Sequence, residues 1–225
     1  MKFSGIQKTS LLDFPDKVST VLFTPQCNLR CPYCHNWRLV LNSRSPFLKE
    51  DEAIQILEER KKYINAVAVT GGEPTIQKDI PQFLEKLRER GFSVKLDTNG
   101  FFPQVLEECL SFVDYVSLDV KTSLEKYRRL GAEDTAALLL AVELLKDGEV
   151  EYEFRATAVP GFFDEEDIPK IGEIIDGGKC FAIQQFVPGD TLDNSYSNVK
   201  PYPAKAIIHF AEMMKQYVGE VVLRI

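Results

Sequence analysis

The sequence predicts an α/β fold with a parallel β-sheet. Short β-rich runs alternate with segments of helical spacing along the chain, and this alternation is typical of βα units joined by right-handed crossovers. No repeat, low-complexity tract or long linker interrupts the series. About six such units favour a partial or complete barrel over a flat sheet, although periodicity alone does not separate the two. We expect residues 1–225 to form a single domain.

The predicted strands are short runs rich in β-branched and aromatic residues. They lie at 21–24, 66–69, 92–96, 115–120, 152–159 and 181–187, with a further strand at 221–225. Apolar residues at helical spacing lie between them, at Ala53, Ile54 and Leu57, at Phe83, Leu84 and Leu87, and over 136–145. Left-handed residues are expected to end helices at Gly91, Gly131, Gly148 and Gly177-Gly178. Asp134 and Asp164 are expected to begin helices as N-caps.

Composition narrows the classes of partner and compartment. The 27 Lys and Arg residues are outnumbered by 34 Asp and Glu residues, which gives a net charge of -7, so no global attraction for nucleic acid or anionic lipid is expected. No basic leader with an apolar core opens the chain, and no apolar run reaches the roughly 18 residues of a spanning helix. The sequence therefore predicts a cytoplasmic protein without nucleic-acid or membrane partners.

Cysteine spacing gives the strongest chemical signal. Cys27, Cys31 and Cys34 follow the first predicted strand, and a reducing compartment favours metal or redox chemistry over disulfides. Three thiolates can bind three irons of a 4Fe-4S cluster and leave the fourth iron without a protein ligand. A zinc site that adds His35 is an alternative, although adjacent ligands at 34 and 35 strain a tetrahedral site. The C-x-x-C-H haem pattern is set aside because Cys27 and the missing leader do not suit it.

Cys109 and Cys180 lie far from this loop in the sequence and are expected to be small buried thiols. His209 lies in an apolar helical setting and is expected to be a packed or surface residue rather than a ligand.

Polar motifs recur at the predicted strand ends, which open onto one rim in a barrel. Gly71 and Gly72 form either a tight turn or a close approach to a ligand, and Glu73 beside them can accept a hydrogen bond from an ammonium group. Asp97 and Asp119 are either solvated residues that cap the strands or, together with Thr98 and Lys121 beside them, a site that binds a cation and the carboxylate of a ligand. Arg155 needs an anionic partner if its side chain points into the barrel, and otherwise points outward into solvent.

These motifs together resemble the radical S-adenosylmethionine enzymes. The C-x-x-x-C-x-x-C loop, with aromatic Tyr33 before its third cysteine, and residues 70–74 carry the likeness, which covers about 10–217. The resemblance implies a partial (β/α)6 barrel, a 4Fe-4S cluster on Cys27, Cys31 and Cys34, and S-adenosylmethionine as cofactor. It also implies that residues 71–73 contact the amino group of the methionine portion.

Residues 97–100, 119–121, Arg155 and 160–161 resemble the glycyl-radical-enzyme activating branch of that family. The resemblance implies that Asp97, Thr98 and Asp119 hold a monovalent cation near the cofactor, and that Lys121 and Arg155 engage the methionine portion. Tyr33 and Asn99 belong to the same motifs and are expected beside the cofactor.

The resemblance also suggests a partner. Residues 5–15 and 185–189 are most similar to activators of anaerobic ribonucleoside-triphosphate reductase, so a glycine of that glycyl radical enzyme is the expected hydrogen donor. The loop after Cys34 holds no further cysteines, which implies an external flavodoxin- or ferredoxin-like electron donor. Two alternatives stay open: a radical enzyme acting on a purine-like small molecule, and a non-catalytic zinc module.

Overall fold

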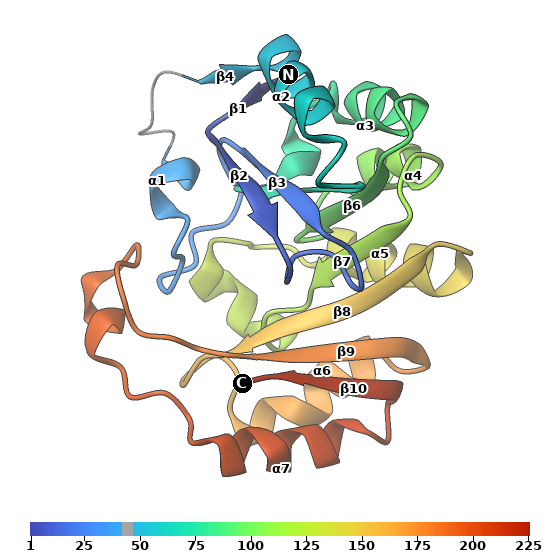
Figure 1. Cartoon of the computed structure of the whole chain (residues 1–225). Helices are drawn as coiled ribbons and strands as arrows, with labels where there is room; N and C mark the ends of the chain where they lie inside the picture. The colour runs from blue at the N-terminus through green and yellow to red at the C-terminus, as the bar shows by residue number, and fades with distance from the viewer. Residues whose placement is uncertain (42–46) are drawn as a thin grey trace. The chain divides into compact units, whose positions relative to one another are not determined.

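The computed structural model describes residues 1–41 and 47–225 (Figure 1). The chain forms two compact units, each made of several segments. The first unit comprises residues 1–28, 36–98 and 104–116, and the second comprises residues 29–35, 99–103 and 117–225. The expectation of a single domain over residues 1–225 stays a prediction.

Parallel strands form the centre of the first unit. β3 (Ser19–Thr24) pairs with β5 (Ala66–Gly71), which pairs with β6 (Ser93–Thr98). β2 (Gly5–Ser10) adds to β3 in the antiparallel sense, and β1 (Lys2–Phe3) forms a separate small sheet with β4 (Leu48–Lys49). Residues 66–69 are fully buried, as expected for a strand with a parallel neighbour on each side.

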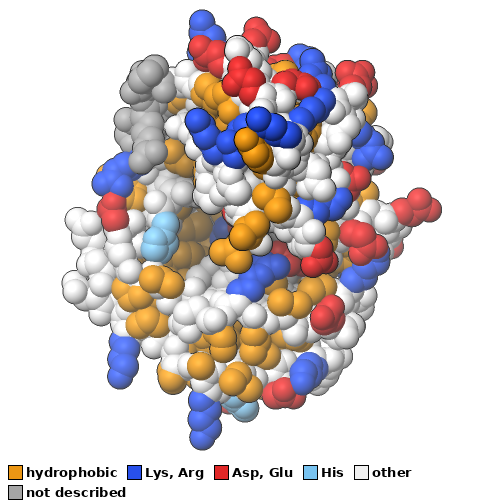
Figure 2. Space-filling view, in the orientation of Figure 1, with side chains coloured by type: hydrophobic (Ala, Val, Ile, Leu, Met, Phe, Trp, Pro, Cys, Tyr) orange, Lys and Arg blue, Asp and Glu red, His pale blue; other side chains and the backbone are white. Residues whose placement is uncertain are grey.

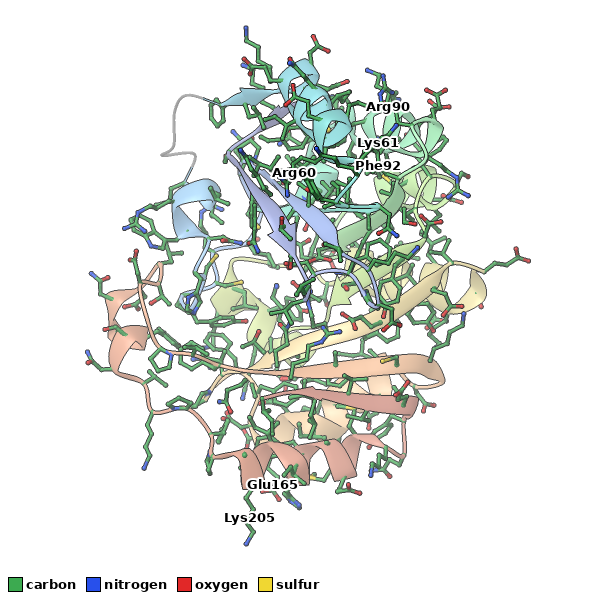
Figure 3. The ribbon with its side chains drawn as sticks, in the orientation of Figure 1. Arg60, Lys61, Arg90, Phe92, Glu165 and Lys205 are labelled. Atoms are coloured by element: carbon green, nitrogen blue, oxygen red, sulfur yellow. The ribbon has the colours of Figure 1, made fainter. Side chains whose placement is uncertain are left out.

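Amphipathic helices surround these strands. The helices are α1 (Trp37–Val40), α2 (Glu50–Arg60), α3 (Ile80–Glu89) and α4 (Pro103–Leu110). In α3 the apolar residues Phe83, Leu84 and Leu87 are fully buried, as their spacing predicts. After α2 the chain turns at Lys61, whose ammonium lies 5.3 Å from the ring centroid of Phe92; both residues are labelled in Figure 3.

The second unit contains the later strands. These are β7 (Tyr115–Asp119), whose last three residues belong to this unit, β8 (Glu151–Ala158), β9 (Gly178–Gln185) and β10 (Val218–Arg224). β8 and β10 each pair with β9 in the parallel sense. The helices are α5 (Ala136–Asp147), α6 (Ile168–Ile174) and α7 (Ala204–Met214), and α7 packs on β9, β10 and α6 (Figure 1).

The predicted strands and helices are present, but several bounds differ and some strands were not predicted. The antiparallel strand β2 was not predicted, because its residues are mostly polar and half-exposed at a sheet edge. β10 begins at Val218, before the predicted start at 221. The expectation of a left-handed Gly148 is wrong, because its φ of -84° is extended. Gly91, Gly131 and Gly177 have positive φ, and Gly178 instead begins β9.

Asp164 is an N-cap as predicted, of the short 3-10 helix Glu165–Asp167, whereas the N-cap of α5 is Thr135, one residue after the predicted Asp134. The Ala136 N–H donates to the Asp134 carboxylate at 2.9 Å, and Asp164 forms a capping box with Asp167. His209 lies on an exposed position of α7, with its Nε2 3.5 Å from Glu165, which Figure 3 labels below that helix. The expectation of a packed or surface histidine is therefore confirmed.

Charges of both signs are interspersed on the face drawn in Figure 2, and hydrophobic side chains gather on its lower part around β10. In β10, Val218 is buried, the next two residues are exposed and the last four are half-exposed, and Ile225 is 57% exposed. Within residues 1–41 and 47–225, no helix has the length and hydropathy needed to cross a bilayer.

Candidate functional site

Gly71 and Gly72 support the segment that leads into the cysteine loop. The Gly72 N–H donates to the carbonyl of Thr24 at 2.9 Å, and the Glu73 N–H donates to that of Gln26 at 2.7 Å. A Cβ at Gly72 would lie 1.7 Å from the Gln26 carbonyl oxygen, and one at Gly71 would lie 2.4 Å from the Thr24 nitrogen. Only glycine permits this approach, so these positions bring two backbones together just before Cys27.

The start of the cysteine loop has further anchors in the first unit. Gln26 has a positive φ of 67°, which is uncommon for a residue other than glycine. Its N–H donates to the Leu39 carbonyl at 2.9 Å, and the side-chain amide of Asn36 donates to the Gly71 carbonyl at 3.1 Å. The backbone conformation before Cys27 is therefore determined by its neighbours on β5 and α1.

The Glu73 side chain is buried and held in one orientation. Its Oε1 accepts hydrogen bonds from the Thr75 N–H at 3.1 Å, the Thr75 hydroxyl at 2.5 Å and the Thr98 hydroxyl at 2.7 Å. Thr75 lies in the short 3-10 helix Pro74–Ile76, for which Glu73 is the N-cap. Glu73 and Thr98 were both predicted as site residues, and the structure brings them into contact.

Asp97 has a buried cation as its neighbour on the same strand. Lys95 and Asp97 are two positions apart on β6, so their side chains share one face of the sheet. Lys95 is 3% exposed, and its ammonium donates to Asp97 Oδ1. The same ammonium lies 6.0 Å from the ring centroid of Tyr115. The sequence analysis missed Lys95, although a lysine inside an apolar strand two residues before an aspartate was a signal for this pair.

The later part of the cysteine loop is anchored within the second unit. The Arg30 N–H donates to the Leu130 carbonyl at 2.7 Å, the Asp193 N–H to the Pro32 carbonyl at 2.8 Å and the Leu192 N–H to the Cys34 carbonyl at 3.2 Å. The buried ring of Tyr33 packs edge-on against Phe162 at 5.2 Å and lies 6.1 Å from Tyr196. Aromatic packing thus positions Tyr33 between the second and third cysteines.

Burial raises the pKa of the Cys31 thiol to about 11, although the nearby Lys121 ammonium opposes part of that shift. Burial also raises the pKa of Tyr33 well above its usual value. Both groups are therefore neutral at pH 7 in the metal-free chain. A metal that binds Cys31 must displace its proton.

Asp119 lies between two cations in the second unit. Arg155 Nε donates to Oδ1 at 2.8 Å, and Lys121 Nζ donates to Oδ2 at 2.7 Å. Burial alone would raise the pKa of Asp119, but the attraction of Arg155 and Lys121 holds it well below its ordinary value. Burial likewise opposes the charge of Lys121, yet Asp119 keeps the pKa of Lys121 above its ordinary value. This group therefore carries one net positive charge.

The remaining predicted residues have local structural roles. Asn99 is buried, and its side-chain oxygen accepts a hydrogen bond from the Phe101 N–H at 3.2 Å. Cys27 lies in the first unit, with its Sγ 3.9 Å from the side-chain oxygen of Asn28. The ring of His35 packs edge-on against Phe186 at 6.4 Å.

Each of the five cysteines is a thiol rather than half of a disulfide. Cys109 is fully buried on α4, as expected, and burial raises its pKa to about 12. Cys180 on β9 is only partly buried, so the expectation of a buried thiol holds for Cys109 alone.

A further charged group was not predicted. Asp164, Glu166 and Asp167 come together in the second unit with spacing that suits a metal ion. Their centre is taken by Lys126, whose ammonium lies 2.5 Å from Asp167, 3.1 Å from Asp164 and 3.7 Å from Glu166. Lys126 thus forms an ion network with three carboxylates that lie about forty residues later in the sequence.

Sequence comparison places these features in a known family. The profile of the Radical SAM superfamily matches residues 21–170, a span that contains the cysteine loop and the motifs at the ends of β5, β6, β7 and β8. The chain belongs to the radical SAM superfamily. Membership implies a 4Fe-4S cluster and S-adenosylmethionine as cofactors. The donor set of this radical SAM chain fits such a cluster, because three thiols lie in one loop whose two parts are anchored by the protein.

Two relatives identify the branch. The chain is 35% identical to the "Putative glycyl-radical enzyme activating enzyme MJ1227" of Methanocaldococcus jannaschii, over 98% of this chain and 95% of that protein. It is 34% identical to the pyruvate formate-lyase-activating enzyme of Staphylococcus aureus (strain USA300), over 69% of this chain and 68% of that protein. The radical SAM chain therefore belongs to the glycyl-radical enzyme activating branch, which implies a glycyl radical enzyme as its partner.

Solved structures agree on the fold. QueE from Escherichia coli superimposes with a TM-score of 0.64 and 16% identity, over 97% of this chain and 92% of that one. Similarity at this level of identity shows the fold alone. It confirms the predicted α/β fold of the radical SAM type.

Proposed function

We propose that Cys27, Cys31 and Cys34 hold the 4Fe-4S cluster and that the chain cleaves S-adenosylmethionine to activate a partner enzyme. The observation that carries this proposal is the position of Cys31 within the second unit. Lys121 and Asp119 lie close enough to Cys31 to act on its pKa, and Arg155 completes the positively charged group around Asp119. A cluster thiolate and a site for a ligand carboxylate thus lie side by side.

The protein's own residues account for cofactor binding. Lys121 and Arg155 bind the methionine carboxylate, since both cations lie beside Asp119 and charged donors suit a carboxylate ligand. Glu73 accepts a hydrogen bond from the methionine ammonium, and Gly71 and Gly72 offer backbone beside it. Tyr33 and Asn99 complete the surroundings of the cofactor. When bound, the reduced cluster supplies one electron that splits S-adenosylmethionine into methionine and a 5′-deoxyadenosyl radical.

The protein then has to orient the radical and exclude water. Hydrogen-atom abstraction needs no side chain as acid or base, so the site requires a dry and fixed geometry rather than a titrating group. Buried Tyr33 and Phe162 contribute to such a site because their rings pack beside the cysteine loop. The proposed hydrogen donor is a glycine Cα of the partner, whose product radical is stabilised by its own flanking amide groups.

The partner proposed is anaerobic ribonucleoside-triphosphate reductase. Residues 5–15 and 185–189 support it through their similarity to activators of that enzyme. The first stretch includes the exposed side chains Leu11 and Leu12, which follow β2 and are 72% and 91% exposed. We further propose a flavodoxin- or ferredoxin-like electron donor and a reducing compartment such as the cytoplasm, because the loop after Cys34 supplies no thiols for extra clusters.

The experiment is anaerobic reconstitution with iron and sulfide, reduction, and assay of 5′-deoxyadenosine with purified partners. Addition of the anaerobic reductase should produce a glycyl radical signal in electron paramagnetic resonance. A reductase in which the target glycine is replaced by alanine is the matched control and should give no signal.

Pyruvate formate-lyase serves as the second partner in the same assay. A glycyl radical on pyruvate formate-lyase and none on the reductase would contradict the partner assignment. An iron-loaded protein that releases no 5′-deoxyadenosine with either partner would contradict the proposed function.

A further inference from the structure

The carboxylate of Asp97 already has a positive partner inside the protein. Lys95 and Asp97 are buried together on one face of β6, and the ammonium of Lys95 donates directly to Asp97 Oδ1. A buried lysine is uncommon unless its charge is matched. The Lys95–Asp97 pair therefore belongs to the buried interior of the first unit and is not a surface ion pair.

Thr98 is engaged in a different contact. Side chains alternate across a strand, so Thr98 is on the opposite face of β6 from Asp97. Its hydroxyl donates to Glu73 Oε1 at 2.7 Å, within the hydrogen-bonded group of Glu73 and Thr75. The side chains of Asp97 and Thr98 therefore point to opposite faces of β6, and the two cannot both bind one small cation through their side-chain oxygens.

The charges lead to the same conclusion. Lys95 neutralises Asp97 in the first unit, and Lys121 with Arg155 more than neutralises Asp119 in the second unit. Neither group has negative charge left over to repay the dehydration of a free cation. Lys126 provides a precedent within this chain, since its ammonium occupies the centre of the Asp164, Glu166 and Asp167 cluster.

The residues present therefore do not fit the monovalent cation that the family resemblance places at Asp97, Thr98 and Asp119. We propose that the Lys95 ammonium, tethered to β6, takes the place of that cation at Asp97 and positions the Asp97 carboxylate for cofactor binding. This inference rests on the proposed function. It makes Lys95 a positioning residue and makes the chain independent of potassium and sodium ions.

The first test measures ion-specific stabilisation of the metal-free chain. The thermal unfolding midpoint is compared in potassium, sodium and choline chloride at equal ionic strength. The wild-type chain should unfold at the same temperature in all three salts. A midpoint that rises in potassium or sodium, but not in choline, would overturn the inference. Because this measurement needs neither cluster nor activity, it is independent of the proposed function.

The second test removes the Lys95 charge and asks whether potassium or sodium ions then stabilise the protein. Lys95→Met keeps the length of the side chain but removes its charge, so the buried Asp97 carboxylate loses the ammonium that donates to it. This variant should gain a potassium- or sodium-specific rise in midpoint. After reconstitution, it should bind S-adenosylmethionine at least about tenfold more weakly in choline chloride, and the inorganic ion should restore most of that loss. A folded variant with no ion response would count against the inference.

Two control variants separate the pair from general effects. Lys95→Met combined with Asp97→Asn removes both charges and should show no ion response, and this neutral pair keeps the test available if Lys95→Met alone fails to fold. Lys17→Met changes another lysine that contacts β6, through the Ser93 hydroxyl at 2.6 Å, and should behave as the wild type does. An ion response in either control would overturn the inference. If the wild-type chain neither takes up iron nor binds S-adenosylmethionine, the proposed function fails instead.

Discussion

The two units use buried aspartates in different ways. In the first unit the Lys95 ammonium donates to the Asp97 carboxylate, so one positive charge is matched to one negative charge. In the second unit Asp119 has two cationic partners, Lys121 and Arg155, and the group keeps a positive charge. A neutral pair fixes geometry, whereas an excess cation in a poorly solvated place attracts an anion. The difference indicates which unit binds the carboxylate of the cofactor.

The surroundings strengthen this contrast. Lys95 is 3% exposed, while the side chains of Lys121 and Asp119 are 19% and 22% exposed. The partly exposed group can receive a ligand from solvent, and the closed pair cannot do so without opening. The group of the second unit also influences Cys31. Ligand binding is therefore expected to depend on the second unit directly and on the first unit through positioning.

Loss of a proposed cluster cysteine should have the largest effect on activity, because S-adenosylmethionine cannot be cleaved without the cluster. Cys31→Ala should lower iron and sulfide content and abolish 5′-deoxyadenosine formation. Cys109→Ala is the matched control: Cys109 is fully buried on α4, so this change should affect stability but not cluster assembly. Normal 5′-deoxyadenosine formation by the Cys31 variant would exclude it as a cluster ligand.

Gly72→Ala tests whether the first unit acts by shaping the cysteine loop. The new methyl group would lie 1.7 Å from the Gln26 carbonyl oxygen, so the backbone before Cys27 must move. We expect a free-energy loss of about 1–3 kcal/mol in denaturant unfolding, together with reduced iron uptake. At Gly91, which has a φ of 76° and open space around its Cα, alanine should cost stability without changing iron uptake. Equal iron uptake by the two variants would contradict this role of Gly72.

Arg155→Ala sharpens the contrast between the aspartates. Removal of one cation from the second unit leaves Asp119 and Lys121 as a neutral pair, like the pair in the first unit. We expect S-adenosylmethionine to bind about 10- to 100-fold more weakly, with iron content nearly unchanged. Equilibrium dialysis of the reconstituted protein measures this loss. Potassium should not restore the affinity, in contrast to Lys95→Met, and restoration by potassium would remove the distinction between the two groups.

Asp119→Asn is expected to give the smallest of these effects. It should lower stability at neutral pH, and this loss should become smaller in acid. The pKa of Asp119 is lowered in the folded chain, so its contribution to stability is complete above the unfolded value of about 4 and is lost as the pH falls through the folded value. The variant should be less stable than the wild type by about 1–3 kcal/mol at pH 7. That difference should narrow below about pH 4. Urea unfolding at several pH values measures it, and a difference that widens in acid would contradict the assigned sign.

Much of the site could be predicted because parallel strands bring their carboxyl ends together. The positions of Glu73 just after β5 and of Asp119 at the end of β7 follow from the alternating βα pattern, whereas Arg155 lies within β8 and Cys31 lies in the loop after β3. The sequence also left two roles open for Gly71 and Gly72. The structure shows a close approach by protein backbone at both positions, which depends on a packing partner that local sequence does not reveal.

What was missed depends on pairing rather than on pattern. Lys95 was hidden within an apolar strand, and its role is visible only when its neighbour Asp97 is seen to share its face. Lys126 meets its carboxylates across about forty residues of sequence, a separation that no periodicity predicts. The polar edge strand β2 lacks the apolar alternation on which strand prediction relies.

The most direct test of the central claim is Mössbauer spectroscopy of protein reconstituted anaerobically with iron-57, with and without S-adenosylmethionine. If Cys27, Cys31 and Cys34 leave one iron without a protein ligand, the cofactor should change the signal of one iron in four and leave the other three unchanged. An identical spectrum in the presence of the cofactor, or a colourless protein that holds zinc in place of iron, would contradict the account.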